Sequence, residues 1–132
     1  MPITYEIDTA RDLVVYHASG NVTPKDALSV MDRAVTETNG AAMHQDVLFL
    51  LDPRASVNEI DVRAIEQIKT RLEDLVSKYP RASVKCAIVS TPPEDLVGEL
   101  WRATTDAYPD IAASTRVFRT VSEAYAWLRP AA

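Results

Sequence analysis

The segment Asp46-Val47-Leu48-Phe49-Leu50-Leu51-Asp52 decides the fold, because five large apolar residues follow one another between two carboxylates. A strand with one face in water alternates apolar and polar residues, whereas a strand covered on both faces is apolar throughout. We therefore predict that residues 47–51 form the central parallel strand of a sheet that helices cover on both faces.

Two strands are expected before this segment. Residues 3–8 alternate apolar and polar side chains, as in an edge strand, and residues 13–18 form a more continuous apolar run. The turn at Arg11-Asp12 joins them into a hairpin. Thr23-Pro24-Lys25-Asp26 then combines an N-cap, a first-turn proline and an acid, which predicts a helix that ends at Asn39-Gly40.

The chain after the central strand alternates helices and strands. We expect a helix over residues 60–76, a strand over 84–89, a helix from Glu94 to Pro109, a strand over 115–119 and a helix from Ser122 to Pro130. The order ββαβαβαβα predicts one α/β domain over residues 1–132. It would hold a mixed, mostly parallel five-stranded sheet and about four helices, with the first strand antiparallel at the edge.

The composition excludes several classes of site. Only three glycines are present in 132 residues, too few for a dinucleotide-binding glycine loop or a Walker-type phosphate loop. One cysteine, Cys86, and two histidines, His17 and His44, have no spacing that resembles a zinc site. We therefore expect neither a metal nor a cofactor. We expect Cys86 to be a buried residue of a strand.

The charge pattern bears on partners and compartment. The net charge is −5, which disfavours nucleic acid and anionic membrane surfaces as partners. The excess lies before residue 61, where four Lys and Arg stand against nine Asp and Glu. The N-terminus lacks the pattern of a signal peptide, and no stretch approaches 18 apolar residues, so we expect a cytoplasmic protein without membrane insertion.

The loops at the carboxyl ends of the strands are the expected place for a binding site, as in other open α/β sheets. The loop after the central strand carries an acid, an arginine and a hydroxyl, and it leads into the long helix. The proposed contact residues for a protein partner or small ligand are Asp52, Arg54, Ser56, Asp61 and Arg63. Hydroxyl and acidic residues at such places also serve simply as helix caps.

Aromatic residues offer a second kind of site. The predicted third helix carries an apolar stripe of Val97, Leu100, Trp101 and Tyr108. Such a stripe packs into the core, or, where it stays exposed, forms an apolar groove for a lipid-like ligand or the face of a homodimer.

An enzyme is the third alternative. It would require Ser56 or Ser90 to meet His17 or His44, or a pairing of carboxylates. Because His17 lies in an apolar strand, it reads as a core or sheet histidine, and the residues favour a non-enzymatic role.

Five features together suggest a family: a hairpin ending in Ser19-Gly20, a helix after Val22-Thr23-Pro24, the buried strand that ends in Asp52, the strand at residues 84–89, and a closing helix that begins after Phe118-Arg119. They resemble the STAS-like (SpoIIAA-like) family, which includes anti-sigma factor antagonists and many small bacterial proteins. The resemblance implies a STAS-like sandwich that regulates a partner protein through its strand-end loops.

One family motif is altered in this chain. Phospho-switched members start the helix after the third strand with an Ile-Asp-Ser-Ser-Gly-like sequence, and the matching stretch here is Ile60-Asp61-Val62-Arg63-Ala64. Arg63 stands at the position of the phosphoacceptor serine. A guanidinium cannot accept a phosphoryl group, but it can bind an anion or a partner's carboxylate. The resemblance therefore does not carry the serine switch over to this position.

Overall fold

The computed structural model describes residues 2–92 and 95–128 and has five strands in these ranges. They are β1 (Ile3–Asp8), β2 (Leu13–Ala18), β3 (Asp46–Leu51), β4 (Val84–Val89) and β5 (Ala113–Phe118). The sheet order is β1-β2-β3-β4-β5, in which β1 pairs antiparallel with β2 and all other pairs are parallel. The α/β class, the mixed sheet and the central place of β3 are thus confirmed.

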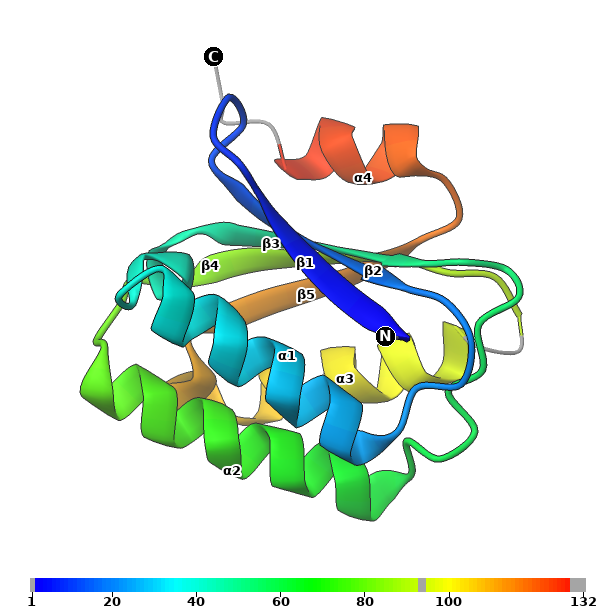
Figure 1. Cartoon of the computed structure of the whole chain (residues 1–132), viewed down its shortest axis with the longest axis horizontal. Helices are drawn as coiled ribbons and strands as arrows, with labels where there is room; N and C mark the ends of the chain where they lie inside the picture. The colour runs from blue at the N-terminus through cyan, green and yellow to red at the C-terminus, as the bar shows by residue number, and fades with distance from the viewer. Residues whose placement is uncertain (1, 93–94, 129–132) are drawn as a thin grey trace.

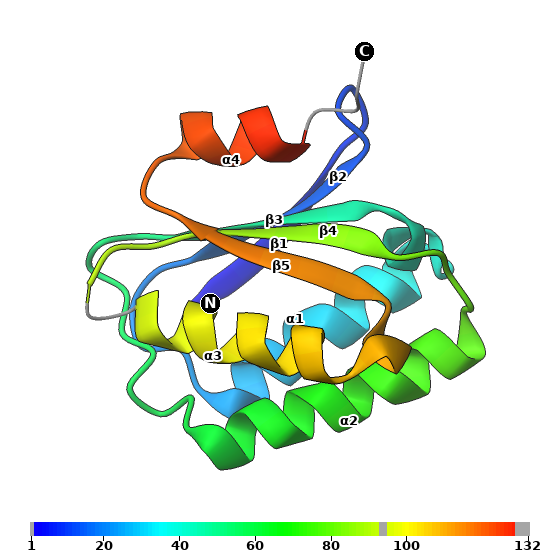
Figure 2. The same cartoon turned by 180° about the vertical axis from the view of Figure 1, so that it is seen from behind.

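Four α-helices and two short 3-10 helices accompany the described strands. They are α1 (Pro24–Glu37), η1 (Ala41–His44), α2 (Val62–Lys78), α3 (Asp95–Ala107), η2 (Pro109–Ile111) and α4 (Val121–Leu128). Figures 1 and 2 show α1, α2 and α3 on one face of the sheet and α4 alone on the other. This three-layer arrangement satisfies the need of a parallel sheet for cover on both faces.

Local sequence explains where the helices begin. Thr23 Oγ1 accepts a hydrogen bond from the Asp26 amide at 3.2 Å, and the Asp26 carboxylate accepts one from the Thr23 amide at 3.0 Å. This reciprocal capping box starts α1 as the sequence indicates. Asp61 starts α2 in a similar way, because its carboxylate accepts a hydrogen bond from the Ala64 amide at 2.9 Å.

Several predicted boundaries differ from the structure. The second helix covers Val62–Lys78 rather than residues 60–76, because Asp61 lies outside the helix as its N-cap. Strand β5 begins at Ala113 instead of residue 115, and neither η1 nor η2 was expected. The predicted helix start at Glu94 and the predicted end at Pro130 lie outside the described residues.

Helix α2 stands farther from the sheet than its neighbours. Helix α1 contacts β1, and α3 packs against β5. Gly98 of α3 permits this close approach, because a Cβ atom at position 98 would lie 3.0 Å from Val117 Cγ2 of β5. Helix α2 packs chiefly against α1, α3 and η2, and both views show it farthest from the strands (Figures 1 and 2). The three helices therefore form an arch over the middle of the sheet.

Within residues 2–92 and 95–128, no helix has both the length and the apolar character needed to cross a membrane.

Candidate functional site

A cavity of about 210 Å³ lies between the sheet and the arch formed by α1, α2 and α3. Its walls come from every strand and from all three helices of that face. The apolar side chains of its lining include Val22, Val30, Met31, Val47, Phe49, Leu51, Ile65, Ile68, Leu72, Ile88, Val97 and Trp101. Since α2 is held off the strands, its apolar side chains do not close the space beneath it.

The central strand is less completely buried than its apolar sequence predicts. Leu48 is fully buried against the α4 side of the sheet, but its neighbour Phe49 is only half-buried. Phe49 lines the cavity, as does Tyr16, whose ring stacks on Phe49 with centroids 5.9 Å apart. Helices lie on both faces of β3 as predicted, but its apolar side chains are not all fully buried, since Phe49 on the cavity side and Leu50 on the α4 side are both half-buried.

An empty apolar cavity of this size is costly for a small domain. At about 24 cal/mol per Å³, 210 Å³ corresponds to about 5 kcal/mol. The net stability of a typical domain is only about 5–15 kcal/mol. A cavity lined by apolar groups also holds water poorly, because water needs polar partners. A small apolar molecule would restore the missing contacts.

Tyr16, Arg81 and Cys86 are polar residues of the cavity lining, and Arg81 precedes the start of β4. Burial raises the pKa of the Tyr16 hydroxyl well above its usual range and that of the Cys86 thiol to about 11. Burial likewise lowers the pKa of the Arg81 guanidinium. The thiol is therefore protonated at neutral pH, which agrees with a strand cysteine and gives no nucleophile.

The strand-end loop residues have roles within the loop and the helix cap. The Asp52 carboxylate accepts a hydrogen bond from the Arg54 amide at 2.8 Å, which lowers the pKa of Asp52, and it pairs with the Arg54 side chain at 3.4 Å. The Ser56 amide donates to the Gly20 carbonyl at 2.8 Å, and the Ser56 hydroxyl accepts from the Asn58 amide at 3.4 Å.

The two proposed arginines do not meet in one pocket. The Arg54 side chain is 91% exposed at the loop, and Arg63 lies on the outer surface of α2 beside a shallow depression shared with α1. Within the described residues, no hydrogen bond or ion pair joins Arg54, Asp61 and Arg63 to one another, and Asp52 and Ser56 are only partly exposed, so the five predicted contact residues do not form one cavity.

The predicted aromatic stripe divides between two places. Val97 and Trp101 line the cavity, and Leu100 packs against the same core cluster. Tyr108 is 40% exposed and holds the Lys69 ammonium 4.0 Å from its ring centroid, outside that cavity. The sequence thus indicated part of the cavity wall, but it described that wall as an exposed helix groove.

The residues considered for catalysis lie apart. His17 Nε2 contacts Glu6 Oε1 at 2.9 Å, and both side chains are exposed. In the ranges that the structure describes, no serine hydroxyl makes a hydrogen bond to either histidine, and the buried Ser90 hydroxyl has no partner. The same ranges contain no group of His, Cys, Asp and Glu that would hold a metal ion. His17 is a sheet residue but not the core residue that its neighbours suggested.

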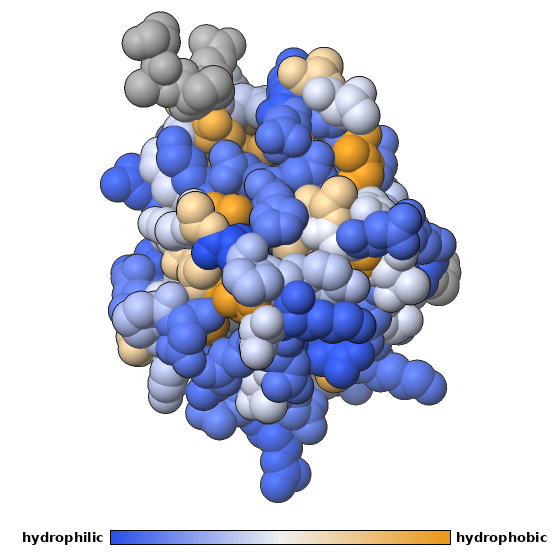
Figure 3. Space-filling view, turned by 90° about the vertical axis from the view of Figure 1, so that its left-hand side faces the viewer, coloured by the Kyte–Doolittle hydropathy of each residue, from blue (hydrophilic) through white to orange (hydrophobic). Residues whose placement is uncertain are grey.

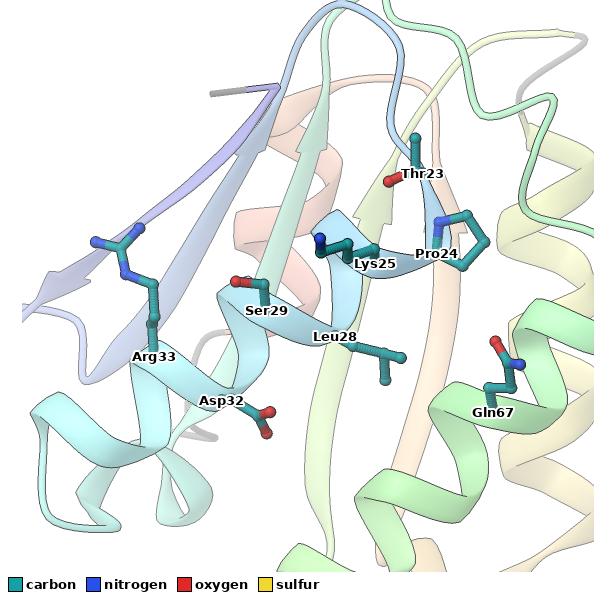
Figure 4. Close-up of a pocket in the computed structure, with 8 residues that line it drawn as sticks. All are labelled: Thr23, Pro24, Lys25, Leu28, Ser29, Asp32, Arg33 and Gln67. Carbon is teal, nitrogen blue, oxygen red and sulfur yellow. The ribbon is translucent and has the colours of Figure 1, made fainter.

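A second hollow lies on the outer surface of α1 and includes Gln67 of α2 (Figure 4). Its side chains do not converge, because Leu28 points toward α2 while Arg33 extends in another direction. The Asp32 carboxylate is held by a bidentate pair with Arg71, both bonds 2.8 Å long. This hollow is open and its acid is occupied, so the apolar cavity is the stronger candidate site.

The outer surface near the polar end of the cavity offers little apolar area. Figure 3 shows the edge at which β3, β4 and β5 begin, and this edge is mainly hydrophilic with small hydrophobic areas. On this side of the molecule, the larger apolar surface is therefore that of the cavity between sheet and helices.

Comparisons with protein-family models, with curated proteins and with solved structures give no match to this chain.

Proposed function

We propose that the protein binds a small apolar molecule in the cavity between the sheet and helices α1, α2 and α3. The observation that carries this proposal is the 210 Å³ of unfilled space with an almost wholly apolar lining. This proposal keeps the lipid-like ligand that the aromatic stripe suggested, but it assigns the ligand to the space beneath the helices instead of to an exposed groove.

The volume limits the ligand. An engineered cavity of about 150 Å³ lined by aliphatic and aromatic residues takes up benzene. The larger cavity here has room for a single ring with a short substituent or for a medium-length alkyl chain. Phe49, Tyr16 and Trp101 give its wall aromatic surface, which suits either kind of ligand.

The two tryptophans allow a direct test. Trp101 lines the cavity, whereas Trp127 lies on α4 across the sheet and packs against Phe118 at a centroid distance of 5.7 Å. The variants Trp127→Phe and Trp101→Phe each leave one tryptophan as reporter. Titration with benzyl alcohol and 1-octanol should change the fluorescence of Trp127→Phe and leave that of Trp101→Phe unchanged.

Equal responses from both single-tryptophan variants would refute binding in the cavity, and so would the absence of saturable binding by calorimetry. Native mass spectrometry of the purified protein adds an independent measurement, because a ligand retained from the cell appears as a discrete added mass.

A STAS-like regulatory module that contacts a protein partner through the strand-end loops is the second candidate. It is favoured by the exposure of Val62 (65%) and Leu96 (70%) at the starts of α2 and α3, the same edge that carries Arg54. In affinity capture from the source cell, a partner that binds the wild type should be lost from the Arg54→Ala/Arg63→Ala double variant. An unchanged set of partners would contradict this function.

A further inference from the structure

Among the residues that the structure describes, Arg81 is the only charged one in the cavity wall. It lies in the connection between α2 and β4, and its guanidinium is held by two backbone carbonyls. Nη1 donates to the Met43 carbonyl at 3.1 Å, and Nη2 donates to the Ile111 carbonyl at 2.8 Å. Because these acceptors belong to η1 and η2, the two 3-10 helices fix the guanidinium at the end of the cavity where β3, β4 and β5 begin.

The guanidinium has unused binding capacity. It carries five N–H donors, of which the protein uses two, and Nε is buried without a partner among the described residues. Both acceptors are neutral, and no Asp or Glu of the described ranges lines the cavity. A desolvated cation is stable in a protein only when charges or hydrogen bonds compensate for the lost water. Arg81 is partly buried, and within the described residues two backbone hydrogen bonds replace the hydration that it has lost.

Two further polar side chains, Tyr16 and Cys86, line the cavity. The rest of the lining is almost entirely apolar, so the cavity has one cationic end and a long apolar body. This polarity matches an amphiphilic ligand whose single anionic group is small and planar.

We propose that the ligand is a small carboxylic acid with an apolar body, and that Arg81 binds its carboxylate while Phe49, Trp101 and the aliphatic lining enclose the body. The inference rests on the proposed function and names its ligand class. An arginine fork suits the two oxygens of a carboxylate. A charge-assisted hydrogen bond contributes about 1.5–3 kcal/mol, which corresponds to about 10- to 100-fold in affinity.

The test compares acids with neutral molecules of the same shape. The wild-type protein is titrated by calorimetry at pH 7 with octanoate against 1-octanol and with benzoate against benzyl alcohol. We expect at least one acid to bind about 10- to 100-fold more tightly than its alcohol. If the alcohols bind as tightly as the acids, the assignment of Arg81 is overturned and the apolar cavity stands. If no acid or alcohol binds, the proposed function fails together with this inference.

Variants then assign the preference to one residue. Arg81→Met keeps an apolar side chain of similar length but removes the charge, and the matched control is Arg116→Met, whose guanidinium lies on Trp127 at 5.4 Å on the far face. Arg81→Met should bind acid and alcohol within about threefold of each other, and Arg116→Met should keep the wild-type ratio. A preference retained in Arg81→Met would overturn the proposal. If Arg81→Met fails to fold, two measurements that do not need this variant decide. They are the ratio of acid affinity to alcohol affinity in the wild type and the same ratio in Arg81→Lys.

Discussion

The cavity predicts that one enlarged side chain will stabilise the protein. Ala27 lies on the inner side of α1 and lines the cavity, so Ala27→Leu places three more carbons in empty space. At about 0.8 kcal/mol for each buried carbon, the gain is at most about 2.4 kcal/mol. The lost rotamer freedom of leucine removes about 0.5–1 kcal/mol of this. We therefore expect an increase of about 1.5 kcal/mol in the free energy of unfolding.

Urea denaturation and a thermal melt measure this increase. With an unfolding entropy of about 2.1 cal/mol/K per residue over 132 residues, 1.5 kcal/mol raises Tm by about 5 °C. Alanine and leucine have similar helix propensities, so the backbone contributes little. The matched control is Ala103→Leu on the exposed side of α3, which should change stability by less than about 0.5 kcal/mol.

The same variant links the cavity to binding. A leucine at position 27 occupies space that a ligand would fill, so Ala27→Leu should bind benzyl alcohol more weakly while Ala103→Leu binds it normally. If Ala27→Leu is destabilised, or is no more stable than the control, the space beneath α1 is not available and the reasoning from cavity volume is refuted.

Three further predictions concern single residues. Gly40→Ala should destabilise the protein by about 2–5 kcal/mol, because φ there is +86° and the new Cβ would lie 2.4 Å from the Tyr79 ring. Gly20→Ala, where φ is +72° and no atom lies near the new Cβ, should lower the free energy of unfolding by only about 1–2 kcal/mol. If urea denaturation shows equal losses for the two variants, the contribution of the clash with Tyr79 is refuted. Burial raises the pKa of the Cys86 thiol from its ordinary 9.0 to about 11 in the folded protein. Above pH 9 the unfolded chain therefore releases a proton from Cys86 that the folded chain keeps. The free energy of unfolding should therefore fall between about pH 9 and 11, by more in the wild type than in Cys86→Val, and parallel pH curves would contradict this. Asp61→Ala removes the N-cap of α2 and should cost about 1 kcal/mol in urea denaturation, whereas Asp61→Asn should retain most of the stability.

Local patterns predicted the elements well where the deciding interactions are local. The capping box of Thr23 and Asp26 spans three residues, and the apolar run of β3 needs only its own composition to indicate a central strand. The helix boundaries were less accurate, because Asp61 is compatible with either an N-cap or a first-turn position. The 3-10 helices η1 and η2 were not predicted, because segments of three or four residues are too short to show hydrophobic periodicity.

The candidate site was only partly visible in the sequence. Val97 and Trp101 were among the predicted groove residues, but no sequence pattern indicated Arg81 as part of the site. Its two acceptors, Met43 and Ile111, lie 38 and 30 residues away in the chain, so nothing near Arg81 indicates what holds it. A lone arginine between an apolar helix and a buried strand was the only local sign.

The amino-acid sequence by itself determined the α/β class, the order of strands and helices, and the scarcity of glycine that excludes nucleotide-binding loops, because each follows from composition or from periodicity along the chain. Only the tertiary structure decided that α2 stands off the sheet, that a cavity of 210 Å³ remains beneath it, and that Arg81 lies at its end. The physical reason is that hydrophobic periodicity specifies which side of a helix faces inward, whereas the height of that helix above the sheet depends on how α1, α3 and η2 pack around it.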